Sequence, residues 1–255
     1  MTVNELHKAL SEKYPKTLSC AWDNDGIMVS ADTDAEVKRV LAALDATHET
    51  VKYAAANGFD TVVTHHPMLF KGAKSVTMAN TSGRRILDAA KSGVSVLSFH
   101  TRLDAGEGGV NDCLCRACGM EPTEFFGDDE APALGRIAVC EPMTARALAQ
   151  LVKEKLGCDA VRLNGNPDRT VTRIGFCGGD GKDFIYPALS AGCDAFVTGD
   201  GGYNMAGDAS EEGIVTIECG HYHSEAVVLA PLAERIRELS GAETVIYNSC
   251  TYTVI

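Results

Sequence analysis

Side chains suited to binding metal ions occur in three short clusters of this sequence. The clusters are His65-His66, His100 with Asp104, and His221 with Glu225. Imidazole and carboxylate groups are ligands of zinc, manganese, iron, cobalt and nickel. Six such groups exceed what one tetrahedral ion uses. They predict two divalent ions about 3.5–4 Å apart that share a carboxylate, as in two-metal hydrolases.

Each cluster follows an apolar run typical of a β-strand, over residues 60–64, 94–99 and 214–219. In α/β folds, ligands gather at the carboxyl ends of strands. Neighbouring residues of a regular strand point to opposite faces. Pro67 disfavours helix at His66 and cannot donate a ladder hydrogen bond. We therefore predict that the chain bends at His65-His66, so that each imidazole serves a different ion. The alternative is one buried structural histidine beside an exposed one.

The two carboxylates lie four residues after a histidine. His100 and Asp104 lie on one face if their segment is helical. If the segment is a loop, the two side chains would hold an ion from that loop. Glu225 is predicted to begin a helix and to bridge two cations. Alternatively, Ser224 caps that helix and Glu225 is an ordinary acid of its first turn.

The charge of such a centre indicates its substrate. Asp104 and Glu225 offset part of the charge of two divalent ions, so the centre stays positive and favours a small anionic substrate such as a nucleotide or phosphate ester. Neutral histidine ligands also need a partner that fixes their tautomer. Asp45, Asp200 and Thr64 are the candidates for that role.

Strand and helix patterns alternate along the chain, which predicts an α/β fold with largely parallel sheets. The predicted strands cover 37–44, 60–64, 94–99, 136–140, 171–177, 195–198, 214–219 and 244–247. The predicted helices cover 48–57, 82–92, 110–118, 144–156, 184–191 and 225–239.

An internal repeat divides the chain. Without gaps, residues 37–64 align with residues 171–198, and identical residues include Arg39 with Arg173 and Asp60 with Asp194. The repeat predicts two similar α/β lobes, residues 1–126 and 127–255, with the last strand a candidate to return to the first lobe. Where the first lobe has His65-His66, the second has Gly199-Asp200. We therefore expect the lobes to share one metal site in the cleft between them.

Composition excludes several classes of protein. The net charge of −12 argues against nucleic acid as a partner. The sequence has no run of about 20 apolar residues that would span a bilayer, and the polar start after Met1 does not look like a signal peptide. Ten cysteines without a secretory signal predict a reducing, cytoplasmic location. Cys113, Cys115 and Cys118 are interpreted as small apolar residues of a helix, with a zinc site as the weaker alternative.

Two further stretches leave alternatives open. Residues 21–27 contain the sole tryptophan, Trp22, which either packs over a capped turn or forms a wall of a substrate site. Residues 178–182 lie between a predicted strand and a predicted helix. This stretch is either a plain turn or a phosphate cradle, although its spacing matches neither phosphate-binding fingerprint.

The sequence resembles the Nif-three-like family, whose bacterial members are labelled GTP cyclohydrolase 1 type 2 homologues. It has the form without the inserted middle domain of longer members. The matching segments cover nearly the whole chain: Trp22-Asp23-Asn24 with Gly26, residues 64–67, residues 100–104 with 109–112, Gly178-Gly179, residues 198–200, and residues 220–225. One difference is that many members have a histidine shortly after the Thr198-Gly199-Asp200 segment, where this sequence has Tyr203, Asn204 and Met205.

The resemblance implies a dinuclear metal centre between two α/β lobes and a ring-shaped homohexamer. The implied metal ligands are His65, His66, Asp104, His221 and Glu225, with Glu225 as the bridge and His100 as a further candidate. We predict that His66 and Glu225 take part in catalysis through a metal-activated water. Asp200, Tyr222 and His223 are open candidates for proton transfer.

The label implies a hydrolase that opens the ring of GTP. The alternatives are a metal-storing ring, or a scaffold that binds a protein partner, because eukaryotic relatives are named for an interaction with a transcriptional adaptor.

Overall fold

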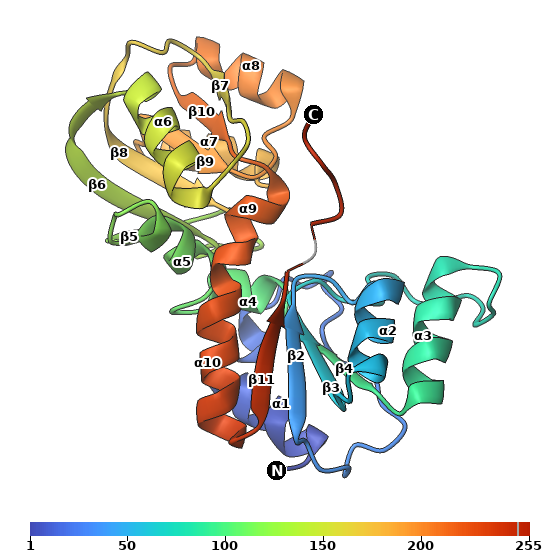
Figure 1. Cartoon of the computed structure of the whole chain (residues 1–255). Coiled ribbons are helices and arrows are strands. Elements are labelled where there is room, and N and C mark those ends of the chain that lie inside the picture. Colours follow the sequence, from blue (N-terminus) through green and yellow to red (C-terminus); the bar gives the residue numbers. More distant parts are fainter. Residues whose placement is uncertain (249) are drawn as a thin grey trace. The chain divides into compact units, whose positions relative to one another are not determined.

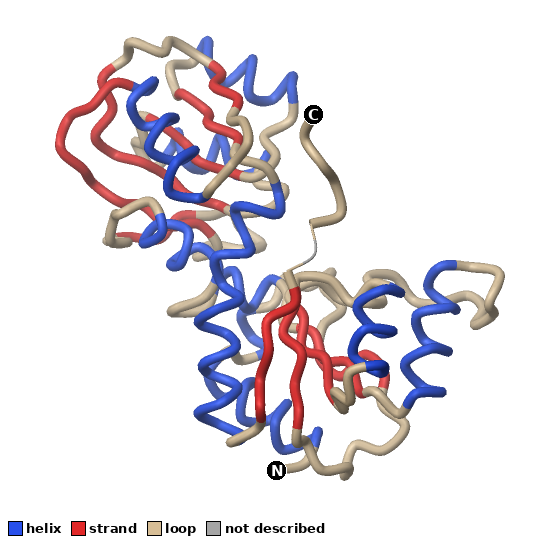
Figure 2. The backbone as a smooth tube through the Cα atoms, viewed as in Figure 1, coloured by secondary structure: helices blue, strands red, loops and turns tan. Residues whose placement is uncertain are grey.

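The computed structural model describes residues 1–248 and 250–255 and divides the chain into two compact units. The first comprises Met1–Gly106 and Leu229–Thr251, and the second comprises Glu107–Val228 and Tyr252–Ile255. Each unit contains one β-sheet with helices packed on it (Figure 1, Figure 2). The prediction of an α/β fold is therefore confirmed. No helix within the described residues is long and apolar enough to cross a bilayer.

The sheet of the first unit has five strands in the order β1-β4-β3-β2-β11. The strands are β1 (Gly26–Val29), β2 (Arg39–Ala43), β3 (Thr61–Thr64), β4 (Ser95–Ser98) and β11 (Glu243–Tyr247). All neighbouring pairs are parallel except β1 with β4. Strands β3 and β4 are fully buried, as expected for short apolar strands covered on both faces.

Helices cover both faces of this sheet (Figure 1). Helices α1 (Val3–Lys13) and α10 (Leu229–Ser240) contact each other on one face, and α2 (His48–Ala56) and α3 (Thr81–Ser92) contact each other on the opposite face. The short elements η1 (Lys16–Leu18) and α4 (Thr101–Ala105) contact each other as well. Thr2 begins α1 with a capping box, which satisfies backbone donors that the first turn leaves open.

The sheet of the second unit has six strands in the order β5-β6-β8-β9-β10-β7. The strands are β5 (Glu124–Phe126), β6 (Gly135–Thr144), β7 (Arg162–Asn164), β8 (Thr170–Cys177), β9 (Ala195–Thr198) and β10 (Val215–Glu218). The three neighbours β8, β9 and β10 are parallel, and the flanking pairs are antiparallel.

The helices of the second unit are α5 (Val110–Ala117), α6 (Ala145–Leu156), η2 (Lys182–Phe184), α7 (Ile185–Ser190), α8 (Tyr203–Glu211), α9 (His221–Glu225) and η3 (Ala226–Val228). Apolar side chains of α5 and α6 form one core with Ile174 and Phe176 of β8. On the opposite face of the sheet, α7 packs closely on Gly175 of β8: a Cβ atom added to this glycine would lie 3.2 Å from Ala188. Both faces of this sheet are therefore also covered.

Corresponding hydrogen bonds occur in the two aligned segments. The Asp60 carboxylate accepts the backbone N–H groups of Lys38 and Arg39, both at 2.9 Å. The Asp194 carboxylate accepts those of Thr172 and Arg173, at 2.9 and 3.0 Å. The three parallel strands β2-β3-β4 correspond in order to β8-β9-β10, and a five-residue helix, α4 or α9, follows the third strand of each set.

Some sequence-based boundaries differ from the structure. The predicted helix over 225–239 is not continuous: α9 ends at Glu225, the 3₁₀ turn η3 follows, and α10 begins at Leu229. Glu225 therefore ends a short helix instead of beginning a long one. The chain divides after Gly106, whereas the sequence placed the boundary after residue 126. The reason is that α5 packs in the core of the second unit and β5 pairs with β6. Strands β1, β5 and β7 and helix α8 were not predicted.

The cysteines at 113–118 lie on or directly after α5. Cys115 and Cys118 are buried in the apolar core of the second unit. Burial raises the pKa of Cys118 to about 12 and that of Cys113 to about 11. The metal-ligand groups found among the described residues contain no cysteine. This arrangement agrees with the interpretation of these residues as small apolar side chains.

The raised pKa values predict which thiols react. At pH 8, iodoacetamide should label the exposed Cys250 rapidly, because the thiolate is the nucleophile and Cys250 is accessible. Cys115 and Cys118 should be labelled only after unfolding. Mass spectrometry of digested protein measures both rates, and a Cys250→Ser variant should lose the fast reaction. Labelling of Cys118 in the folded protein as fast as Cys250 would contradict this packing.

Candidate metal centre

The candidate ligands of the first unit lie at the carboxyl edge of its parallel strands. Ala43, Thr64 and Ser98, the last residues of β2, β3 and β4, are register partners across the sheet. The residues that follow them must therefore lie at one edge. This register brings together Asp45, the His65-His66 pair and His100, which are far apart in the sequence.

The chain leaves the regular strand at His65-His66. Successive N–H groups of a regular parallel strand point to opposite neighbours. Here the N–H groups of both histidines donate to the same segment, to Ala43 O at 3.3 Å and Leu44 O at 2.8 Å. The hydroxyl groups of Thr64 and Ser98 lie 2.8 and 3.2 Å from the His66 carbonyl oxygen. The bend predicted before Pro67 therefore exists. Because of it, the side chains of His65 and His66 need not point to opposite faces of the sheet.

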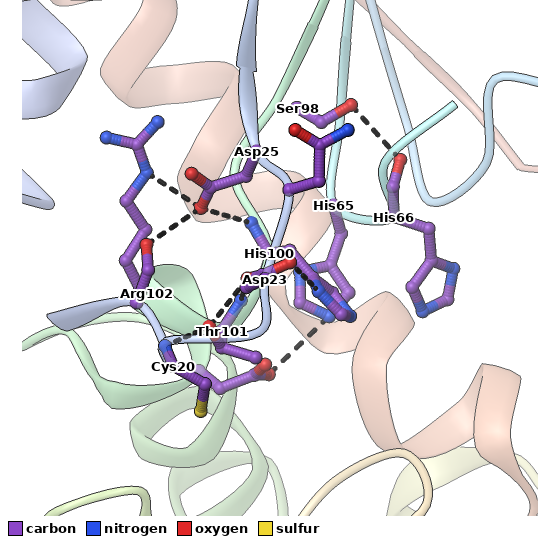
Figure 3. A network of polar contacts seen from close by, with 12 residues as sticks. Cys20, Asp23, Asp25, His65, His66, Ser98, His100, Thr101 and Arg102 are labelled. Atoms are coloured by element: carbon purple, nitrogen blue, oxygen red, sulfur yellow. Dashed lines mark hydrogen bonds and ion pairs between the residues drawn. The ribbon is translucent and has the colours of Figure 1, made fainter. Parts of the chain in front are cut away.

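Three imidazoles gather at this edge (Figure 3). The ring centroid of His65 lies 4.8 Å from that of His66 and 5.3 Å from that of His100. One ligand nitrogen from each of the three lies within 4.8 Å of the others. His65 is fully buried, whereas His66 and His100 are partly exposed. Such a triad can hold a metal ion that keeps access to solvent.

Each of these three rings has its Nδ1 atom beside a group that can only accept a hydrogen bond. His65 Nδ1 lies 3.1 Å from the Phe99 carbonyl oxygen. His66 Nδ1 lies 3.0 Å from Asp45 Oδ1. His100 Nδ1 lies 2.8 Å from Asp23 Oδ1 (Figure 3). A carbonyl or carboxylate oxygen requires the proton on Nδ1, so the Nε2 lone pair is the one available to a metal.

Asp23 holds more than one group of this edge. Its second carboxylate oxygen accepts the Thr101 N–H at 3.0 Å and the Thr101 hydroxyl at 2.6 Å. Burial raises the pKa of the Asp23 carboxyl, but the hydrogen bonds from His100 and Thr101 outweigh it and lower the pKa to about 2. Asp23 is therefore a permanent carboxylate at neutral pH, which keeps the His100 ring in one orientation.

Asp104 lies on the single-turn helix α4, so the helical alternative for residues 100–104 is the one observed. Its Oδ1 atom lies 3.5 Å from His65 Nε2. Two ligands at zinc-like bond lengths and a tetrahedral angle are separated by about 3.3 Å. The pair His65 and Asp104 thus has a spacing that suits two ligands of one ion. The imidazole that pairs with Asp104 at this distance is that of His65.

The second unit has a similar pair on α9. His221 Nδ1 donates to Asp200 Oδ2 at 2.9 Å, and His221 Nε2 lies 3.3 Å from Glu225 Oε1. Glu225 is buried, whereas His221 is partly exposed. Ser224 does not cap a helix through its side chain. Its hydroxyl donates to the His221 carbonyl at 2.8 Å and accepts the Gly179 N–H at 2.9 Å.

The glycine turn of residues 178–182 is a packing feature. Its first two N–H groups are used internally, because Gly178 donates to Asn111 Oδ1 at 2.7 Å and Gly179 donates to Ser224 Oγ. A Cβ atom on Gly179 would lie 2.2 Å from Glu225 Oε1, and its φ of +65° favours glycine. The turn thus leaves room for the Glu225 carboxylate, and these two amides do not form a phosphate cradle.

The sequence missed some partners of the histidines. Asp45 and Asp200 were among its candidates, and the structure places them on His66 and His221. The third candidate, Thr64, contacts a backbone carbonyl instead of an imidazole. Asp23 and the Phe99 carbonyl were not predicted. Asp23 could have been found because it lies in the Trp22-Asp23-Asn24 segment of the resemblance, whereas a backbone carbonyl has no sequence signal.

The chain matches a known family. A family model described as Duf34/NIF3 (NGG1p interacting factor 3) matches residues 1–252, so the chain belongs to this family. A curated relative from Clostridium perfringens, named GTP cyclohydrolase 1 type 2 homolog, is 31% identical over 242 residues, covering 93% of this chain and 92% of the relative. A relative of the same name from Lactococcus lactis is 33% identical, with 89% and 88% covered.

Solved structures have the same fold. Staphylococcus aureus protein SA1388 superposes with a TM-score of 0.88 at 27% identity, covering 100% of this chain and 99% of the other. The Bacillus cereus protein related to NIF3 superposes with a TM-score of 0.89 at 22% identity, with the same coverage, which supports the fold alone.

The close approach of Gly179 to Glu225 gives a direct test. Gly179→Ala should displace the Glu225 carboxylate, costing about 1–3 kcal/mol in the free energy of unfolding from overpacking and about 1–2 kcal/mol from the left-handed backbone. It should also weaken metal binding, as measured by titration with zinc. Gly157→Ala is the matched control, because Gly157 has a similar φ of +67° and no atom within 4 Å of the added Cβ. Equal metal affinity in the two variants would contradict this role of the glycine.

Proposed function

We propose that this protein holds two divalent metal ions with ligands from both units. His65, His66 and Asp104, with His100 as a further ligand, would come from the first unit, and His221 and Glu225 from the second. The observation that carries the proposal is that each of the four histidines has an acceptor on Nδ1, which prepares Nε2 for a metal. His48 has the same arrangement with Asp88. The distinguishing feature is that His65, His66 and His100 also bring one ligand nitrogen each within 4.8 Å of one another.

Two observations support a shared centre. The corresponding Asp60 and Asp194 hydrogen bonds and the common strand order are consistent with two lobes that arose by duplication. Yet the ligand sets are unequal, since the first unit supplies three imidazoles and the second supplies the His221-Glu225 pair. Two ions need more ligands than either set provides, so the two sets would serve one centre, with Glu225 as the bridge.

The reaction that this centre supports best is hydrolysis of a nucleotide or another phosphate-bearing small molecule. A pair of bound divalent ions lowers the pKa of water and neutralises charge on the substrate. The protein would orient the ligands of these ions. His66 is partly exposed and its ring is fixed by Asp45, whereas Glu225 is buried. The names of the curated relatives support a reaction on GTP.

A non-catalytic role is the second candidate. The family description names an interacting factor, which supports a partner-binding scaffold. In the segment where many members have a histidine, this chain has Tyr203, Asn204 and Met205, and Tyr203 is highly exposed at the start of α8. The metals could then be stored or structural. For either function, we also predict a hexameric ring and a cytoplasmic location.

Metal content tests the ligands. The purified protein should contain about two divalent ions per chain by elemental analysis, and Glu225→Ala should lose at least one. Glu154→Ala, an exposed glutamate on α6, is the control and should lose none. Unchanged metal content in Glu225→Ala would refute the bridging role.

The Nδ1 acceptors can be tested without removing a ligand. Asp45→Ala and Asp200→Ala should weaken metal affinity about 10- to 100-fold, because the histidine ring loses the partner that fixes its tautomer. Circular dichroism should show that both variants keep the fold. Affinities within twofold of the parent protein would mean that these hydrogen bonds serve the fold alone.

Turnover separates the two functions. A panel of GTP and phosphoester substrates should show metal-dependent hydrolysis that is lost in His66→Ala. His48→Ala is the control, because His48 pairs with Asp88 and is no candidate ligand. A metal-loaded protein without turnover on the panel would favour the storage or scaffold role.

A further inference from the structure

Two exposed aromatic side chains contact each other beside the histidine triad. Trp22 is 54% exposed and Phe70 is 48% exposed. Their ring centroids are 5.8 Å apart with an interplanar angle of 64°. Each centroid also lies 6.1 Å from that of His100, and both rings meet the imidazole edge to face. The three rings form an aromatic cluster, Trp22, Phe70 and His100, at the same edge of the first sheet.

The segments that present these rings are tied to the site. The Asp23 N–H donates to the Cys20 carbonyl at 3.0 Å, which closes the turn at Trp22. The Cys20 N–H donates to Thr101 Oγ1 at 2.9 Å. Asn24 donates from its side-chain amide to the carbonyl of Leu69, the residue before Phe70. The aromatic pair is therefore held by a continuous hydrogen-bond network that includes the partner of His100.

This arrangement suits a planar ligand. An edge-to-face contact covers a face of only one of its two rings, so other ring faces remain available for stacking. Exposed aromatic side chains that are scattered singly need no explanation, but a fixed cluster beside a polar site is typical of a ligand site. If Trp22 only packed over its own turn, its side chain would be more buried than the observed exposure of 54%.

We propose that Trp22 and Phe70 form the binding subsite for the planar heteroaromatic ring of a small ligand, a nucleobase of a nucleoside or nucleotide. This assignment rests on the proposed function, since it places the ring of the substrate beside His100 and the proposed metal centre. The net charge of −12 opposes a polyanion, so the nucleobase comes from a free nucleoside or nucleotide and not from a nucleic acid strand.

The sole tryptophan reports on this subsite. The full-length protein is titrated with guanosine, guanosine monophosphate, ribose 5-phosphate and a short single-stranded oligonucleotide. Fluorescence is excited at the long-wavelength edge of tryptophan absorption and corrected for ligand absorbance. Guanosine and guanosine monophosphate should quench Trp22 saturably, because both carry the ring. Ribose 5-phosphate should not, because it lacks the ring.

The Phe70→Leu variant keeps an apolar side chain but removes the aromatic face. It should weaken guanosine binding at least about fivefold, the lower end of the loss of a base-stacking contact. Phe125→Leu, which changes an exposed phenylalanine of the second unit, is the matched control and should bind guanosine as the parent does. Sedimentation of both variants should equal that of the parent.

Several outcomes would overturn the proposal. They are no quenching by guanosine, unchanged affinity in Phe70→Leu, tighter binding of the oligonucleotide than of the mononucleotide, or a changed assembly state in Phe70→Leu, which would mark the pair as a self-association surface. Elemental analysis of the same samples keeps the two proposals distinct. Guanosine binding by a protein without metal would defeat the metal centre and leave the ring subsite intact, whereas two bound ions without guanosine binding would do the reverse.

Discussion

A histidine can bind a metal through Nε2 only when its proton is on Nδ1, and this constraint organises the candidate site. His65, His66, His100 and His221 each have a carbonyl or carboxylate acceptor at Nδ1. Such acceptors fix both the tautomer and the direction of the ring. The acceptors come from different segments, so the loops that carry them must be held in place before any ligand can act.

The parallel strands supply that placement. In each unit three neighbouring strands end in register, and the polar segments follow directly. The apolar strands themselves are buried, so the polar groups gather where the strands stop. The same strand order in the two units explains why both present a short helix, α4 or α9, with a carboxylate beside an imidazole.

Buried charge is the cost of this arrangement, and it is offset locally. Arg102 is almost fully buried, yet its Nε atom lies 3.0 Å from Asp25 and its guanidinium packs 4.2 Å from the centre of the Phe99 ring. The Asp23 side chain is buried as well and accepts from His100 and Thr101. Removing one partner of such a pair leaves an uncompensated charge, which typically costs about 3–5 kcal/mol. The network therefore holds the start of α4 and the turn at Trp22 together.

The sequence by itself determined the strand ends that carry His65-His66, His100 and His221, because apolar runs and Pro67 have local signals. It also indicated the repeat, through Asp60 and Asp194. Only the tertiary structure decided that Glu225 ends a short helix, that Asp104 pairs with His65, and that Asp23 and the Phe99 carbonyl orient two histidines. Those pairings join segments up to 77 residues apart, and no local pattern in a sequence encodes which distant backbone oxygen or carboxylate a folded chain brings to an imidazole.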